Sequence, residues 1–158
     1  MYPKQMTMIC KPFSQDLHDD NDPQARRKVQ DFFLNQQGIE LVENPDKYDI
    51  DLLQKDNGSI LAGYEVERRH NWHTRDFPFT TLHVPARKAK YADRAYPTYY
   101  VATNKLMNYA LMMPFTELKE AYCLEQRNRF VGRGEFFFNV PVNNTEVIHL
   151  DAKGYGSD

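Results

Sequence analysis

The sequence predicts an α/β or α+β domain in which helices flank a central mixed β-sheet. Two observations predict this fold class. Residues 23–37 carry apolar side chains at helical spacing, and Asp22-Pro23 before them and Gly38 after them suit the two ends of a helix. Three short apolar runs, 39–43, 48–54 and 59–69, then follow, joined by the turn-forming stretches NPDK and DNG. One helix followed by three strands is therefore expected in the first half of the chain.

The second half continues with further strands and a second helix. Residues 78–93 predict a strand followed by a basic loop, and residues 98–114 predict a hairpin that turns at Asn104 and Lys105. The stretch 114–128, which begins with Pro114, predicts a helix. Residues 132–151 predict two strands with a turn at VNN. The first of them carries the aromatic run Phe136–Phe138, which we expect to pack in a core or to form a subunit contact.

Length and composition describe an ordinary folded domain. With 158 residues, 41% of them hydrophobic and 13% aromatic, the chain predicts one domain over 22–150, preceded by an arm over 1–21 and followed by a tail over 151–158. Two cysteines form no disulfide framework, and we see neither a secretory signal nor an apolar run long enough to span a membrane. We therefore expect no membrane partner and a cytoplasmic location, the host cytoplasm if a phage encodes the protein.

Charge is divided unevenly along the chain. Residues 16–67 contain thirteen Asp and Glu against five Lys and Arg, a net of −8, although the whole chain carries only −2. Residues 68–105 contain eight Lys and Arg against two Asp, a net of +6. Solvated faces would explain both runs. An acidic metal site beside a basic rim that holds phosphate would explain them as well.

Four acids occupy alternate positions in two neighbouring predicted strands: Asp49, Asp51, Glu65 and Glu67. A three-residue hairpin loop that ends with a left-handed Gly58 would place Asp51 opposite Gly63 and all four acids on one face. A two-residue loop would shift the register by one and put the two pairs on opposite faces. We predict the three-residue loop.

Carboxylates gathered on one face repel one another unless a cation or a proton relieves them. Mg²⁺ accepts carboxylate oxygens together with retained waters, and it can activate water and stabilise charge on a phosphate. The alternative is a hairpin with one wet, acidic face and one apolar face. His70 and His73 suggest zinc only weakly, because no second ligand pair follows them at the spacing of a zinc finger.

The order helix, strand, strand with Asp51, short turn and strand with Glu65-Val66-Glu67 resembles the core of the PD-(D/E)xK nucleases, the restriction-endonuclease-like superfamily. The small phage and bacterial members look most similar. The resemblance implies a Mg²⁺- or Mn²⁺-dependent deoxyribonuclease in which Asp51 and Glu65 bind metal together with the backbone carbonyl of Val66. Asp49 is the second choice for the metal-binding aspartate. Glu67 stands at the position where the family usually carries lysine, and some members have glutamate at this position. Glu67 would orient or deprotonate the attacking water.

DNA is the partner that this resemblance implies, and a homodimer is left open. We assign five basic residues that follow the acids to nucleic-acid contact, because cations interleaved with aromatic residues suit phosphates and bases: Arg68, Arg69, Arg87, Lys88 and Lys90. Two alternatives remain open. The chain would be a catalytically inactive nucleic-acid-binding module with the nuclease fold, or a phage structural or assembly protein.

Overall fold

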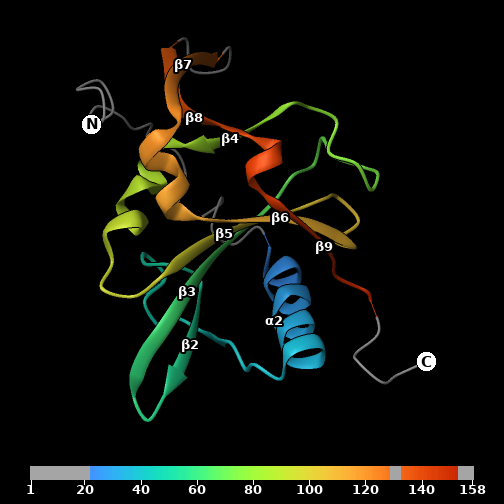
Figure 1. Ribbon diagram of the computed structural model, residues 1–158, viewed down its shortest axis with the longest axis vertical. Coiled ribbons are helices and arrows are strands. Elements are labelled where there is room, and N and C mark those ends of the chain that lie inside the picture. The colour runs from blue at the N-terminus through green and yellow to red at the C-terminus, as the bar shows by residue number, and fades with distance from the viewer. Residues whose placement is uncertain (1–21, 129–132, 153–158) are drawn as a thin grey trace.

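The computed structural model describes residues 22–128 and 133–152, so the predicted arm over 1–21 and the tail from residue 153 lie outside the described residues. The elements in chain order are α2 (Pro23–Gln37), β1 (Val42–Glu43), β2 (Leu52–Asp56), β3 (Ser59–Arg68), β4 (Thr81–Pro85), the 3₁₀ segment η2 (Ala86–Asp93), β5 (Thr98–Thr103), β6 (Tyr109–Pro114), the 3₁₀ segment η3 (Phe115–Glu120), β7 (Tyr122–Asn128), β8 (Arg133–Pro141), the 3₁₀ turn η4 (Val142–Asn144) and β9 (Glu146–His149). Figure 1 labels most of them.

Two sheets organise the described residues. The larger sheet has six strands in the order β1-β2-β3-β5-β6-β9, and the smaller has three in the order β4-β8-β7. The larger sheet is mixed, because β3 and β5 run parallel to each other while all other pairs of neighbouring strands in this sheet are antiparallel. The predicted mixed sheet and the α+β class are therefore confirmed. None of the described helices is long and apolar enough to cross a bilayer.

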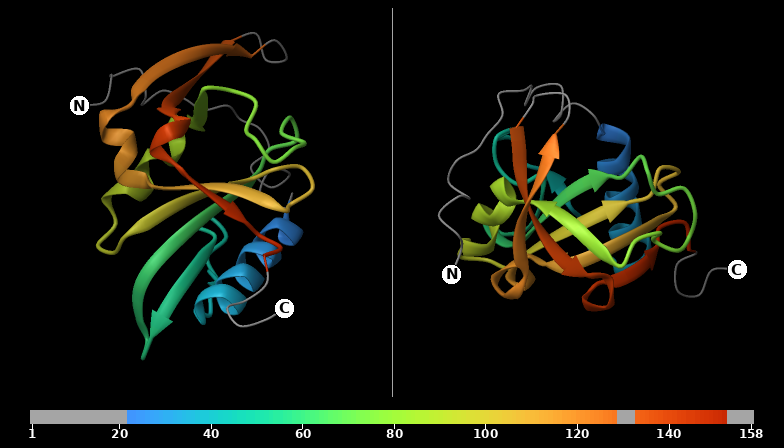
Figure 2. Two further views of the ribbon diagram at one scale, coloured as in Figure 1. Left: turned by 45° about the vertical axis from the view of Figure 1, so that its right-hand side comes forward. Right: turned by 90° about the horizontal axis from the view of Figure 1, so that it is seen from above.

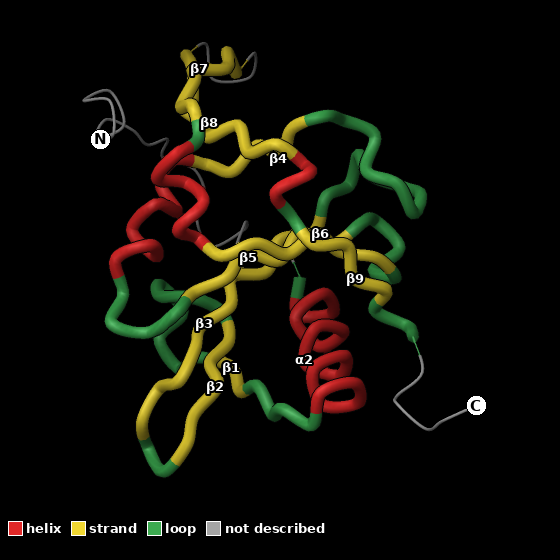
Figure 3. The backbone as a smooth tube through the Cα atoms, viewed as in Figure 1, coloured by secondary structure: helices red, strands yellow, loops and turns green. Residues whose placement is uncertain are grey.

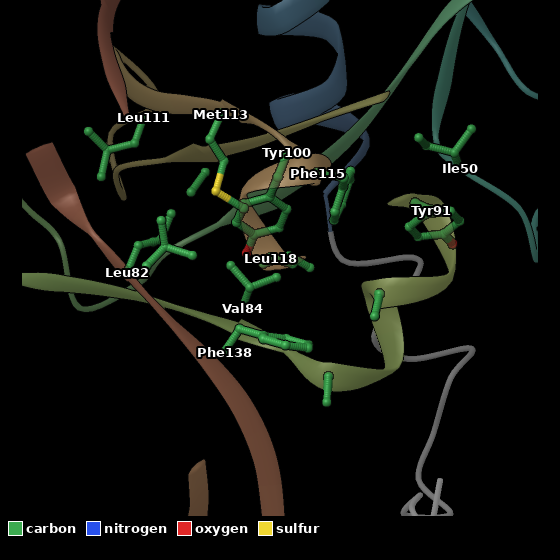
Figure 4. Packing of buried hydrophobic residues seen from close by; sticks show 14 of the residues in the cluster. Ile50, Leu82, Val84, Tyr91, Tyr100, Leu111, Met113, Phe115, Leu118 and Phe138 are labelled. Atoms are coloured by element: carbon green, nitrogen blue, oxygen red, sulfur yellow. The ribbon is translucent and has the colours of Figure 1, made fainter. Parts of the chain in front are cut away.

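The two faces of the six-stranded sheet are covered differently (Figure 2). Helix α2 packs Ala25, Val29 and Phe33 against one face. The opposite face is covered by η2, η3 and the smaller sheet, which enclose a second apolar core shown in Figure 4. The prediction that helices flank the sheet is thus correct for one face only. On the other face, short 3₁₀ segments and the smaller sheet lie where a helix was expected.

Helix α2 has the predicted bounds. Pro23 occupies its first turn, and Gly38 ends it in the left-handed conformation at φ 66°, donating its N–H to the carbonyl of Leu34. Asp22 makes no side-chain cap and instead lies 3.3 Å from the guanidinium of Arg68 at the end of β3.

The β2–β3 hairpin, which projects from the body of the molecule in Figure 3, has a register that the sequence analysis did not predict. Its turn contains only two residues, Asn57 at φ 50° and Gly58 at φ 84°, so the predicted three-residue loop is wrong although the left-handed Gly58 is confirmed. Pairing then skips Leu61, which a β-bulge leaves unpaired. This extra residue adds a second one-residue shift to that of the turn, so the register differs from the predicted one by two residues and Asp51 stays on the face of Glu65.

The predicted helix over 114–128 is wrong beyond residue 120. Only η3 is helical, and the following residues form β7, which pairs along its whole length with β8. The partner strand β8 is the next element along the chain, so β7 and β8 form an antiparallel pair of consecutive strands. The predicted basic loop is the 3₁₀ segment η2. Phe138 is buried in the core as expected for the aromatic run.

Candidate functional site

Strand β3 divides its side chains between the two cores. Tyr64 and Val66 pack with helix α2 on one side of the sheet. Glu65 and Glu67 lie on the other side, where they contact side chains from η2 and β5. Alternation along a strand makes this division unavoidable, so the two acids share a face as the sequence predicted.

One hydrogen bond joins Asp51 to Glu65, and a second joins Asp51 to Val66. The backbone N–H of Asp51 donates to Glu65 Oε1 at 3.2 Å, and the N–H of Val66 donates to Asp51 Oδ2 at 2.9 Å. Asp51 directly precedes β2, and its carboxylate accepts the N–H of Val66 on the side of β3 that faces β2. The end of β2 therefore places two carboxyl groups side by side at the edge of β3.

Lys88 supplies the positive charge of this group. Its Nζ lies 2.8 Å from Glu65 Oε2 and 3.7 Å from Glu67 Oε1, and only 6% of the residue is exposed. Burial alone would lower the pKa of Lys88, but Glu65 and Glu67 outweigh it and raise that pKa above its ordinary value. The prediction that Lys88 contacts DNA is therefore corrected, because its ammonium group is buried and occupied by two carboxylates.

Tyr100 holds the third acid. Its ring is fully buried, and its hydroxyl donates to Glu67 Oε1 at 2.5 Å while accepting a hydrogen bond of 2.8 Å from Arg69 Nη2. Arg69 also lies 3.8 Å from Glu67 and donates to the backbone carbonyl of His83. Burial and the charge of Glu67 raise the pKa of Tyr100 despite the opposing charges of Arg69 and Lys88, so the hydroxyl remains a donor.

Tyr100 was not among the predicted site residues, and Arg69 does not lie where its predicted role would place it. The guanidinium of Arg69 is directed to groups inside the protein, which corrects its predicted role as a DNA contact. A tyrosine hydroxyl in an otherwise apolar strand was the available signal, because a buried hydroxyl requires a hydrogen-bond partner. That signal does not identify the partner.

The charge of the group is unbalanced. Burial, and then the neighbouring carboxylate of Glu65, raise the pKa of Asp51 to about 7, although Lys88 and the N–H of Val66 act in the opposite direction. Lys88 and Arg69 thus compensate only part of the negative charge of Asp51, Glu65 and Glu67, because two cations face three acids. We call the three acids and Lys88, with Tyr100, the acid cluster. A further cation beside Asp51 would relieve the remaining repulsion.

The donor atoms suit a small divalent cation. The N–H groups of Gly63 and Arg69 donate to carbonyls of the β5 side, whereas that of Val66 donates to Asp51. Since the N–H and carbonyl of one strand residue face the same edge, the carbonyl of Val66 faces Asp51 as well. Two carboxylates and one carbonyl are oxygen ligands of the kind Mg²⁺ takes together with waters. In the described part of the chain, no three His, Cys, Asp or Glu side chains form a metal-binding group, so waters would complete the coordination.

Asp49, the second choice for a metal ligand, lies apart from the acid cluster. Its Oδ1 accepts hydrogen bonds from Arg94 at 2.8 Å and from the N–H of Ile50 at 2.7 Å. Burial alone would raise the pKa of Asp49, but these two donors outweigh it and the pKa is lowered. The structure therefore separates the two aspartates that the sequence left as alternatives.

The remaining predicted DNA contacts are spread over two places. Arg68 donates to the backbone carbonyl of Lys105 from Nε and Nη2, at 2.9 and 2.7 Å. In η2, Arg87 is partly exposed, while Lys90 is exposed with its ammonium 5.2 Å from the centre of the Tyr91 ring. The structure does not gather the five predicted residues into one basic surface.

No known protein family and no curated protein matches this chain. The geometry of the acid cluster is therefore the basis for its functional interpretation.

Proposed function

We propose that the chain is a Mg²⁺- or Mn²⁺-dependent nuclease that hydrolyses phosphodiester bonds in DNA. The observation that carries the proposal is the hydrogen-bonded pair Asp51 and Glu65, held at a strand edge with more negative charge than Lys88 compensates. The order α2, β1, the β2–β3 hairpin and the parallel strand β5 also agrees with the arrangement on which the resemblance to PD-(D/E)xK nucleases rests.

Asp51, Glu65 and the carbonyl of Val66 would hold the cation. When bound, the cation would lower the pKa of a coordinated water and stabilise charge on the phosphate. Glu67 would orient the attacking water and accept its proton, since Tyr100 fixes one of its oxygens in place. Lys88 would hold the carboxylate of Glu65 in position rather than contact the phosphate.

The test is cleavage of supercoiled, linear and single-stranded DNA by the purified chain with Mg²⁺, with Mn²⁺ or with EDTA. We expect cleavage that depends on the divalent cation and is lost in Asp51→Asn and in Glu65→Gln. Asp49→Asn is the matched control, because it makes the same chemical change two residues away in a carboxyl group bound to Arg94. Far-ultraviolet circular dichroism would verify that each variant is folded.

Two results would contradict the assignment. Undiminished cleavage by a folded Glu65→Gln variant would remove Glu65 from the site. Loss of cleavage in Asp49→Asn but not in Asp51→Asn would transfer the metal-binding role to Asp49. Cleavage of one DNA form in preference to the others would define the substrate.

A second candidate function is a DNA-binding module without catalysis. One observation favours it: the ammonium group of Lys88 forms an ion pair with Glu65 and so neutralises a carboxylate that would otherwise bind a metal ion. In that case the protein would bind DNA with a steep salt dependence and would not cleave it with either metal. If it neither bound nor cleaved DNA, a structural or assembly role would be left.

A further inference from the structure

Exposed basic and aromatic side chains gather at the end of the six-stranded sheet that lies beyond Glu67. They come from the β3–β4 connection over 69–80 and from the turn between β5 and β6, both drawn as green loops on the right of Figure 3. We call this surface the loop platform, and its members are His70, His73, Arg75, Phe79, Lys105 and Leu106.

The direction of the strands brings the two loops together. Because β3 and β5 are parallel neighbours, their carboxyl ends lie at the same edge of the sheet. Hydrogen bonds then join the loops: the N–H of Lys105 donates to the carbonyl of Trp72 at 2.7 Å, and Asn104 Nδ2 donates to the carbonyl of Thr74 at 3.0 Å. The loops therefore form one connected surface.

Buried residues hold the loop platform to the body of the protein. The side chain of Trp72 is fully buried in the core and packs edge-on against Phe77 at 5.3 Å between ring centres. Asn104 is also fully buried, and its Oδ1 accepts the N–H groups of Asn108 and Tyr109. Packing and hydrogen bonds therefore fix the backbone of the two loops that carry the exposed side chains.

The exposed chemistry favours a polyanion with accessible bases. Arg75 and Lys105 are exposed basic residues, and Asp76 is the one acid within 69–80. Phe79 packs edge-on against Phe77 at 5.6 Å and still has 51% of its surface exposed. A positively charged surface that carries an exposed aromatic ring suits a single strand, whose phosphates contact the cations and whose bases stack on the ring.

We infer that the loop platform binds a single-stranded stretch of the nucleic acid that reaches the acid cluster. This inference rests on the proposed function for the identity of the substrate, and it adds the form of the strand and the surface that holds it. The platform begins immediately after β3, within a few residues of Glu67. A strand bound there would lie next to the acids.

The test is binding of a fluorescein-labelled 20-nucleotide oligothymidine to the full chain, followed by fluorescence anisotropy in EDTA at several salt concentrations. The same strand in a duplex is the competitor. We expect tighter binding of the single strand, a loss of about tenfold in Phe79→Ser, and a salt dependence whose slope falls by about 0.7 in each of Arg75→Gln and Lys105→Gln.

Matched controls lie on other exposed surfaces. Lys55→Gln removes one cation from the β2–β3 hairpin, and Tyr48→Ser removes an aromatic ring that is 68% exposed. Both are expected to bind as the wild type does. Platform variants that bind no differently from these controls, a wild type that does not bind, or equal binding of the duplex would overturn the inference.

The design separates this inference from the proposed function. Binding is measured without a divalent cation, so it does not depend on catalysis. Asp51→Asn is expected to lose cleavage and to keep oligothymidine binding, whereas the platform variants are expected to lose binding. Cleavage that survives normally in all platform variants would overturn the platform while leaving the nuclease assignment intact.

Discussion

Asp49 and Asp51 are the same residue type two positions apart, but the nearest charged side chain is positive for Asp49 and negative for Asp51. Asp49 is paired with Arg94 near the surface, and its pKa is lowered. Asp51 adjoins Glu65 at a strand edge, and its pKa is raised to about 7. Two carboxyl groups that the sequence presents as equivalent therefore have opposite effects on the stability of the fold.

The difference teaches that the nearest charge and the depth of burial decide what a carboxyl group does. Arg94 comes from the segment after η2 and stabilises the charged form of Asp49. Lys88 comes from η2 itself but bonds to Glu65, so its charge stabilises the ionised form of Asp51 without a hydrogen bond to it. Lys88 and Arg69 pair with Glu65 and Glu67, and this leaves the charge of Asp51 the least compensated in the acid cluster.

The largest expected effect is on the ion pair that allows the acid cluster to be buried. Lys88→Met would leave Glu65 buried without its partner, which typically destabilises a protein by about 3–5 kcal/mol. Urea denaturation would measure the free energy of unfolding. Lys90→Met, which changes an exposed lysine of the same segment, is expected to stay within about 0.5 kcal/mol of the wild type. Equal effects of the two variants would show that Lys88 does not compensate the buried acids.

The second prediction is a pH dependence that belongs to Asp51. Because its pKa is higher in the folded state than the ordinary value of 3.8, its ionisation destabilises the fold as the pH rises from about 4 to about 7. Asn cannot ionise and can still accept the N–H of Val66. In EDTA, Asp51→Asn is expected to match the wild type near pH 4 and to exceed its stability above pH 7 by up to about 4 kcal/mol. A stability difference that does not change with pH would refute this explanation.

The third prediction concerns the hydroxyl that fixes Glu67. Tyr100→Phe removes the donor to Glu67 and the acceptor for Arg69 while keeping the buried ring, so we expect a loss of about 1–3 kcal/mol in the free energy of unfolding. Tyr48→Phe, at an exposed ring, is the control and should change nothing measurable. In the proposed nuclease, Tyr100→Phe would also lower kcat more than it changes KM. A fall in stability with unchanged kcat would restrict Tyr100 to a structural role.

The smallest expected effect is at Asp49, and its sign is opposite to that of Asp51. The lowered pKa means that its carboxylate stabilises the fold above about pH 4 and that this contribution disappears as the pH falls below the ordinary value of 3.8. Both side chains of the pair are about 30% exposed, so Asp49→Asn is expected to cost less than about 1 kcal/mol at pH 7. The same urea series at high salt should reduce the loss further. A gain of stability at pH 8 would mean that Arg94 does not compensate Asp49.

Local signals predicted helix α2 and the β5–β6 hairpin well because the causes of these elements are local. Pro23 and Gly38 define the ends of α2 through their own backbone conformations. The β5–β6 turn was placed correctly at Asn104 and Lys105 because alternating apolar strands flank it. The helix predicted over 114–128 failed beyond residue 120 because residues 122–128 form β7 and pair with β8.

The acid cluster was predicted in part for the same reason. Strand alternation places Glu65 and Glu67 on one face whatever the rest of the chain does. The position of Asp51 next to Glu65 depended on two features that each shift the register by one residue in the same direction, the two-residue turn and the bulge at Leu61, and neither was predicted. Asp51, Glu65 and Glu67 kept the predicted common face because a shift of two residues preserves the alternation, whereas Asp49 pairs with Arg94 instead.

By itself, then, the sequence determined the α+β class, the bounds of α2 and the acids that line one face of β3, since each follows from the spacing of neighbouring residues. Only the tertiary structure decided that Lys88 is buried against Glu65, that Tyr100 fixes Glu67 and that Arg94 removes Asp49 from the cluster. These pairings join side chains from segments far apart in the chain. Their charges and hydrogen bonds depend on how η2 and β5 pack against β3, which no spacing within the sequence specifies.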